Sequence, residues 1–179
     1  MVTTTTKLTT FAEFEQLPEV AGFRQELRHG ELVQVAPPIH QHSRAQWQLR
    51  RLLERDAGET GVVREEFSFR PRADYEYRIA DVAFLSRARW ENIDPNGYLV
   101  GAPELVIEVL SPSNTAAEIL DKESICLENG SREFWVIDLD RRQVKVSTPD
   151  GHTITYRAGQ EIPLFFATDS KLPVDEIFA

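Results

Sequence analysis

Apolar positions along the first third of the chain alternate between helical and strand-like spacing. A Thr-x-x-Glu capping box at Thr10 predicts a short helix from residue 11 to about residue 17. A His-Gly turn then separates two strand-like runs, residues 24–28 and 31–36, which predicts a hairpin. Between residues 41 and 56 apolar side chains recur every three to four positions, which predicts a helix packed on a core.

The remaining pattern predicts a sheet covered by helices. Residues 63–70 alternate, which places Val63 and Phe69 on the same side of a strand. Further strands are expected at residues 75–86, 104–110, 133–139, 143–148 and 153–157, and a last helical turn at 174–178. A second capping box at Thr115 opens a helix that runs to about Asn129. Strands that surround and alternate with two substantial helices predict an α/β fold with a mixed central sheet, helices on its faces and added hairpins at both ends.

Composition and length set the class of protein. A chain of 179 residues suits one well-filled core, so residues 10–179 are expected to form a single domain behind a flexible, threonine-rich leader of residues 1–9. The single cysteine, Cys126, cannot form an internal disulfide, and no secretion signal is recognisable, which favours the reducing cytoplasm. No apolar run approaches the about 20 residues of a membrane helix, so no membrane association is expected.

Charge is distributed unevenly along the chain. The net charge of −9 excludes a nonspecific DNA coat, because the phosphate backbone would be repelled. Residues 40–90 nevertheless carry ten arginines and no lysine against eight acidic residues, whereas residues 91–179 carry seven basic and sixteen acidic residues. A nucleic-acid surface is therefore expected to use the arginine-bearing middle segment.

Two of the predicted apolar strands carry a carboxylate in their interior. Asp81 interrupts the apolar run of residues 79–85, and Glu108 interrupts that of residues 105–110. An unpaired carboxylate in a core is costly, and two side by side would repel each other unless a positive partner lay between them. Because Mg²⁺ takes oxygen ligands, often one or two carboxylates together with substrate phosphate, the two acids predict a site for Mg²⁺ or Mn²⁺.

The following helix adds a lysine to the same region. Ile119 and Cys126 lie three residues before and four residues after Lys122, so Lys122 is expected on or beside the face that packs on the sheet. An inward lysine near two carboxylates can hold the attacking water or stabilise charge on a phosphate. Asp81, Glu108 and Lys122 together make a coherent phosphodiester-cleaving site.

Each of these residues also has a structural interpretation when taken singly. Asp81 could cap a turn or pair with Arg78, and Glu108 could pair with an arginine of the middle segment. Lys122 could extend along its helix with the amine in water. Taken jointly, the two interrupted strands favour the site, because two buried carboxylates without a local partner are otherwise hard to stabilise.

Several short motifs are spread over nearly the whole chain. The most specific is Pro-Glu-Leu-Val-Ile-Glu-Val-Leu-Ser-Pro-Ser-Asn at residues 103–114, followed by Lys122, Gly130 and Glu-Phe-Trp-Val-Ile-Asp at residues 133–138. The others are Gln-Glu-Leu at 25–27 with Gly-Glu at 30–31, Ala-Pro-Pro at 36–38, His42, and Ala-Asp-Val at 80–82. In these motifs the chain resembles the Uma-two family of PD-(D/E)xK restriction-endonuclease-like proteins.

The resemblance implies a nuclease-like fold and roles for individual residues. It implies Asp81 and Glu108 as metal ligands with the Val109 carbonyl as a third. Lys122 would be the signature lysine, moved onto the helix because Leu110 occupies the usual position two residues after Glu108.

The resemblance also implies supporting residues and shows departures. Glu26 would be an auxiliary acidic residue, and His42 and Ser111 could contact the metal ligands or the substrate. Ala80 replaces a proline of the family pattern, and Cys126 replaces a tyrosine on the lysine helix.

Two functions from different classes remain after this comparison. The first is a Mg²⁺- or Mn²⁺-dependent endonuclease that acts on DNA in preference to RNA, as a homodimer by analogy with the family. The second is a catalytically inactive nuclease-like domain that binds nucleic acid or a protein partner, which the net charge of −9 favours. A sugar hydrolase with a carboxylate pair would give Lys122 no role.

Overall fold

The structure, a computed structural model, describes residues 7–112 and 114–179. Its helices are α1 (Phe11–Phe14), α2 (His40–Ala57), α3 (Arg87–Glu91), α4 (Ala116–Glu128) and α5 (Val174–Ile177). Its strands are β1 (Arg24–Arg28), β2 (Glu31–Val35), β3 (Gly61–Arg70), β4 (Arg78–Ser86), β5 (Leu99–Val100), β6 (Leu105–Val109), β7 (Glu133–Asp138), β8 (Gln143–Ser147), β9 (Thr153–Arg157), β10 (Glu161–Pro163) and β11 (Lys171–Pro173).

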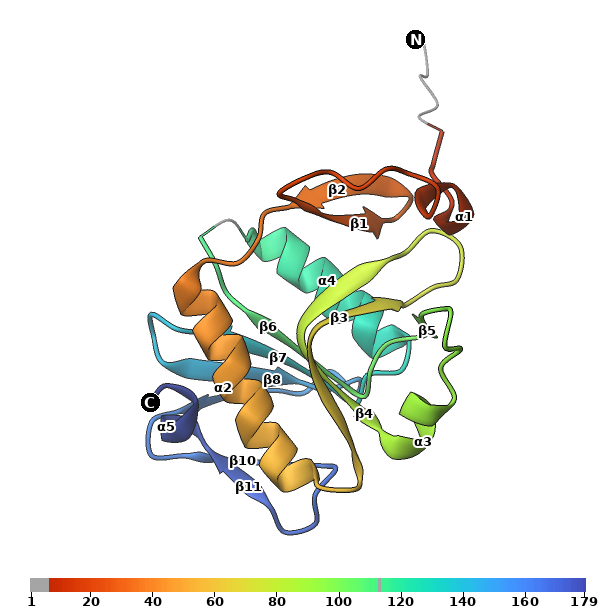
Figure 1. Ribbon diagram of the computed structural model, residues 1–179. Coiled ribbons are helices and arrows are strands. Elements are labelled where there is room, and N and C mark those ends of the chain that lie inside the picture. Colours follow the sequence, from red (N-terminus) through yellow and green to blue (C-terminus); the bar gives the residue numbers. More distant parts are fainter. Residues whose placement is uncertain (1–6, 113) are drawn as a thin grey trace.

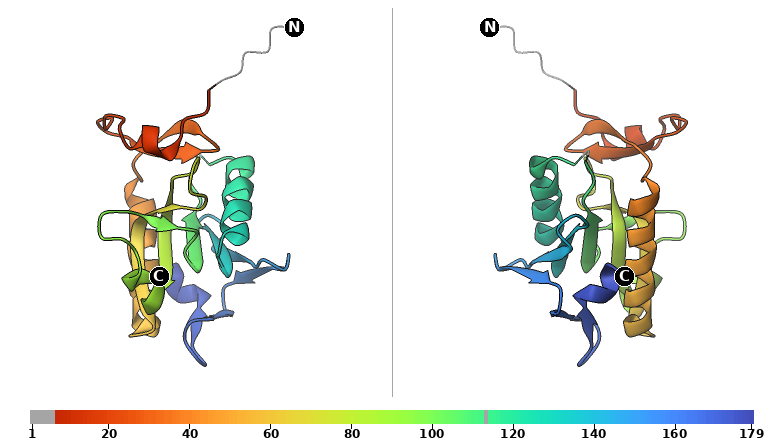
Figure 2. Two further views of the ribbon diagram at one scale, coloured as in Figure 1. Left: turned by 90° about the vertical axis from the view of Figure 1, so that its right-hand side faces the viewer. Right: turned by 90° about the vertical axis from the view of Figure 1, so that its left-hand side faces the viewer.

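A seven-stranded mixed sheet with the order β5-β3-β4-β6-β7-β8-β9 forms the centre of the molecule. The pairs β3–β4, β4–β6, β7–β8 and β8–β9 are antiparallel, whereas β6–β7 and β3–β5 are parallel. Helices α2 and α4 cover opposite faces of this sheet (Figure 2). The hairpins β1–β2 and β10–β11 lie outside the sheet at opposite ends (Figure 1). The predicted α/β fold, with a helix-flanked mixed sheet and hairpins at both ends, is confirmed.

Each face of the sheet has its own apolar core. On one face Leu49 and Leu53 of α2 pack with Trp135 and Ile137 of β7, and all four side chains are fully buried. On the other face the side chains of α4 pack with alternate positions of the same strands. Strand β6 is buried at every position because both of its faces are covered. The carboxylate of β6 is therefore held inside the core.

Strand β3 changes faces at Glu66. Val63 packs in the apolar core between the sheet and α2 (the α2 cluster), whereas Phe69 packs in the core between the sheet and α4 (the α4 cluster). The regular alternation predicted for residues 63–70, which placed both on one side, is therefore wrong. Glu66 has a φ of 52°, in the left-handed region that residues other than glycine seldom adopt. In the β3–β4 register Glu65 pairs with Val82 and Phe67 with Ala80, but Glu66 and Asp81 between them are not paired. The ladder is therefore interrupted at Asp81.

The β1–β2 hairpin is fixed against the start of β4. The amides of Leu27 and Tyr77 donate to each other's carbonyls at 2.9 Å. The amide of His29 donates to Glu76 Oε1 at 2.9 Å, and buried Glu76 also accepts from Arg78 Nε at 2.8 Å. The hairpin consequently lies across the end of the sheet near the first turns of α2 and α4 (Figure 1).

Local signals predicted the long elements better than the short ones. Both capping boxes are present, at Thr10 and Thr115, although α1 ends earlier than expected, at Phe14. The short elements α3, β5, β10 and β11 were not predicted. Of the expected leader, residues 1–6 lie outside the described residues, and the Thr9 amide donates to the Gly30 carbonyl at 2.9 Å. Among the described helices, none combines the length and apolar character needed to cross a membrane.

Candidate active site

A cavity of about 340 Å³ lies where five parts of the fold meet. These are the β1–β2 hairpin, the start of α2, the start of β4, the end of β6 and helix α4. Six of the seven residues singled out by sequence line it: Glu26, His42, Asp81, Glu108, Ser111 and Lys122. Its other wall is apolar and comes from β2 and the linker to α2, residues 35–39. The fold thus brings residues from several segments between Arg24 and Lys122 into one hollow.

Asp81 and Glu108 lie side by side where the β4–β6 ladder stops. The register runs through Val82 opposite Ile107 and does not continue to the next pair, which is Asp81 opposite Glu108. Their side chains replace the missing ladder contacts. Glu108 Oε1 accepts from the Asp81 amide at 3.3 Å, and Asp81 Oδ2 accepts from the Val109 amide at 2.7 Å. Each carboxylate is therefore anchored by the backbone of the other strand.

Lys122 points into the same spot from helix α4. Its Nζ lies 2.8 Å from Glu108 Oε1 and 3.7 Å from Glu26 Oε1, and it donates to the Ile79 carbonyl at 2.6 Å. The side chain is only 8% exposed, so the interpretation in which its amine lies in water is wrong. The partner of Glu108 is likewise this lysine and no arginine of the middle segment.

Glu26 joins the cluster from the hairpin. Its Oε1 accepts from the Ile79 amide at 2.9 Å, and its Oε2 accepts from Arg28 Nε at 2.7 Å. Arg28 reaches on to Glu118 at the start of α4. Glu26 therefore ties β1 to β4 next to Lys122, while its role as an auxiliary acid stays a prediction.

Helix α2 holds the other side of Asp81. His42 Nε2 lies 3.1 Å from Asp81 Oδ1, and Gln46 Nε2 donates to the same oxygen at 3.0 Å. Gln46 also donates to Glu66, which pairs with Arg24 of β1. Sequence reasoning missed Gln46, although a signal existed: His42 and Gln46 are one helical turn apart, both polar, on the face that is otherwise apolar.

The remaining expectations are placed as follows. The Ser111 amide and hydroxyl both donate to Asn114 Oδ1, at 2.8 and 3.0 Å, at the mouth of the cavity. The amide of Val109 contacts Asp81, while its carbonyl as a metal ligand stays a prediction. Arg78 pairs with Glu76 and Asp121, both at 2.8 Å, so the alternative in which Arg78 partners Asp81 is wrong.

The buried cluster holds more negative than positive charge. Burial raises the pKa of Glu108 to about 8 against the opposing charge of Lys122, and the charges of Asp81 and Glu26 add to the rise. Burial works to lower the pKa of Lys122, but Glu108, Glu26 and Asp81 outweigh it and raise that pKa. Burial of Asp81 is outweighed by His42, Lys122 and the Val109 amide, which hold its pKa below the usual range. Lys122 therefore stays an ammonium, and Glu108 is the acid that takes up a proton.

The donor set fits a hard divalent cation. Asp81 and Glu108 are adjacent carboxylates, and a bound cation would offset both the burial and the neighbouring negative charge that raise the pKa of Glu108. Within residues 7–112 and 114–179, no group of three or more His, Cys, Asp or Glu side chains is arranged to hold a metal. An ion here would therefore take two side chains, with main-chain oxygen, water and substrate phosphate completing its shell, as Mg²⁺ commonly does.

A mixed sheet with acids on two adjacent strands, flanked by helices, defines the restriction-endonuclease-like class of folds. Residues 11–174 match the family model Uma2, described as "Putative restriction endonuclease", and the chain belongs to this family. A crystal structure titled as that of "a putative nuclease" from Anabaena variabilis ATCC 29413 has a TM-score of 0.81 and 23% identity, covering 94% of this chain and 97% of that one. That likeness shows the fold. No curated protein matches the chain.

Proposed function

We propose that the protein is an endonuclease that hydrolyses DNA phosphodiester bonds with Mg²⁺ or Mn²⁺. The observation that carries the proposal is the convergence of two buried carboxylates on adjacent strands with one buried lysine, 2.8 Å from Glu108. A structural role alone does not require this arrangement, because burying three acids around one lysine is costly. Membership of a nuclease-like family supports the same reaction.

Each residue of the site has its own role in the proposed reaction. Asp81 and Glu108 would hold the cation, with the Val109 carbonyl as a third ligand. A divalent metal supplies a Lewis acid for the phosphate and lowers the pKa of bound water. Lys122 keeps its proton. Because two of its three N–H groups point to the Ile79 carbonyl and to Glu108, the third would donate to the attacking water or to a phosphoryl oxygen, where negative charge develops. Glu26 and the Ile79 carbonyl fix the lysine, and His42 and Gln46 fix Asp81.

The direct test is nicking of supercoiled plasmid by purified protein in Mn²⁺ or Mg²⁺. We expect wild type to nick only with metal, and Asp81→Asn to lower the rate by about 10²–10³, because the change removes a charged ligand while keeping its shape. Glu104→Gln is the matched control: Glu104 precedes the same strand β6 at its other end and pairs with Arg89 at 3.1 Å, outside the cavity.

The binding-only alternative makes opposite predictions for the same samples. It requires that wild type never nicks DNA with either metal and that Mn²⁺ shows no calorimetric binding that depends on Asp81. Equal rates for wild type and Asp81→Asn would also reject the proposed site, because a contaminating nuclease would then explain the nicking.

A further inference from the structure

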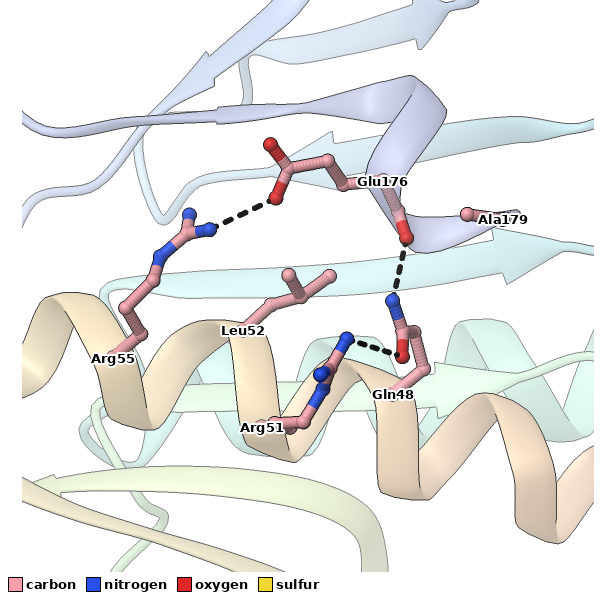
Figure 3. Close-up of a pocket in the computed structure, with 6 residues that line it drawn as sticks. All are labelled: Gln48, Arg51, Leu52, Arg55, Glu176 and Ala179. Carbon is pink, nitrogen blue, oxygen red and sulfur yellow. Dashed lines mark hydrogen bonds and ion pairs between the residues drawn. The ribbon is translucent and has the colours of Figure 1, made fainter.

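The cavity continues as a series of connected hollows along helix α2. His42 and Ser111 line both the cavity and the next hollow, and Gln41 and Leu139 line that hollow and the one after it. Gln48 then joins the third hollow to a trough of about 510 Å³ between α2 and α5. Figure 3 shows Arg51, Leu52 and Arg55 on the α2 side of this trough and Glu176 on its α5 side. The hollows thus follow one another along α2 from the carboxylate site, and Asp138, Asp140 and Arg141 line the second of them.

Arginines without a carboxylate partner line the far part of this path. Arg51 donates to Gln48 Oε1 at 3.2 Å, and Arg142 lies over the ring of Phe178. In the described part of the chain neither guanidinium forms an ion pair with an Asp or Glu side chain, and the same holds for Arg44. Arg44 donates to the main-chain oxygen of Ala179 at 3.3 Å, a contact that an anion would have to displace. Arg51 and Arg142 are available to an anion, whereas Arg55 is already tied to Asp56 and Glu176.

An exposed aromatic ring interrupts the arginines on α2. Trp47 is 51% exposed, and the guanidinium of Arg51 lies 5.1 Å from the centre of its ring. Arg44, Trp47 and Arg51 follow at intervals of three and four residues, so they form one stripe on the outer face of the helix. At about 1.5 Å per residue the two arginines are about 10 Å apart along the helix axis, about three nucleotides of a strand.

We propose that this stripe, Arg44–Trp47–Arg51 with Arg142 beside it, binds an unpaired DNA strand that continues from the scissile phosphate. The arginines bind its phosphates, and the Trp47 ring stacks on a base, which requires that the base be free of a complementary strand. Because α2 also carries His42 and Gln46 against Asp81, the helix fixes the stripe relative to the carboxylates. The inference rests on the proposed function and names its substrate as DNA that is single-stranded on one side of the cut.

Binding of a fluorescein-labelled single strand of about 20 nucleotides, measured by anisotropy in EDTA, tests this surface without cleavage. We expect Arg44→Ala and Arg51→Ala each to weaken binding several-fold and to lower the slope of log affinity against log salt by about 0.7. Trp47→Ala should weaken binding of the single strand about tenfold and leave binding of a duplex unchanged. These positions are exposed, and circular dichroism checks that the variants fold.

Arg64→Ala is the matched control. Arg64 also lies over a tryptophan ring, that of Trp90 at 4.9 Å, but in a hollow that shares no residue with the path. Wild-type binding for Arg51→Ala, or an equal loss for Arg64→Ala, overturns the proposal while leaving the cleavage site standing. Tighter binding of duplex with no effect of Trp47→Ala overturns the single-strand assignment. Arg51-dependent binding by a protein that never nicks DNA supports the stripe and rejects the proposed nuclease activity.

Discussion

Replacing Lys122 with alanine is expected both to abolish metal-dependent nicking and to lower the stability of the fold. The Lys122 ammonium is the shared partner of Glu108 and Glu26 inside the core, at 2.8 and 3.7 Å. Its removal leaves buried Glu108 without a cationic partner and Glu26 with Arg28 alone, which costs about 3–5 kcal/mol of the free energy of unfolding. The nicking rate should fall by about 10²–10³, because a charge placed at the reacting phosphate is lost.

Two further lysine variants separate the catalytic from the structural contribution. Lys122→Arg keeps the charge, so it should recover much of the stability, but its planar guanidinium cannot reproduce the compact ammonium and nicking should stay low. Lys145→Ala is the control: Lys145 pairs with Glu123 at 2.7 Å on a partly exposed surface, where an ion pair contributes about 1 kcal/mol or less. Urea unfolding and plasmid nicking measure both effects. A Lys122→Ala protein as stable and active as wild type contradicts the assignment.

Replacing Glu108 with glutamine is expected to make the metal-free protein more stable while it abolishes metal binding. Burial raises the pKa of Glu108 to about 8 from 4.5, so the folded chain keeps a proton that the unfolded chain has lost. Stability is therefore lost as pH rises from about 4.5 to about 8, by on the order of 3 kcal/mol at pH 7. Glutamine has the shape of the protonated carboxyl and does not titrate, so the Glu108→Gln variant lacks this pH-dependent loss of stability.

Urea unfolding in EDTA at several pH values measures the difference in unfolding free energy between Glu108→Gln and wild type. Glu108→Gln should exceed wild type by roughly 1–3 kcal/mol at pH 7, and the difference should close near pH 4.5. Added Mn²⁺ should stabilise wild type and leave the variant unchanged. Glu118→Gln is the opposite-sign control, because hydrogen bonds from Thr115 lower the pKa of Glu118 and that substitution should destabilise at neutral pH. A Glu108 variant less stable than wild type at pH 7 would show that the carboxylate is a structural ion pair.

Sequence reasoning indicated the candidate site through residues that break an apolar pattern. Asp81 and Glu108 are visible because the runs around them predict buried strands, where a carboxylate needs a special reason. Lys122 is visible because Ile119 and Cys126 define the inward face of its helix, and in the structure Cys126 is fully buried in the α4 cluster. The resemblance to the Uma-two family added Glu26, which no local pattern indicates.

What the sequence did not reveal depends on long-range geometry. The left-handed Glu66 is an ordinary position in an alternating run, and only pairing with β4 makes it interrupt the ladder opposite Asp81. Gln46 is visible in the sequence as a polar residue on an apolar helix face, but its partners Asp81 and Glu66 follow only from the packing of α2 on the sheet. The register of a strand is set by its partner strand and by the packing of both faces of the sheet, so an interruption of the ladder cannot be read from a local period.

The central claim is that Asp81 and Glu108 bind one divalent metal ion next to Lys122. A crystal soaked in Mn²⁺, with data collected at the manganese absorption edge, tests it most directly. The account predicts an anomalous peak between the two carboxylates, within about 2.0–2.4 Å of an oxygen of each. Manganese bound elsewhere in the crystal, with both carboxylates still held by Lys122 and the backbone amides, would contradict it.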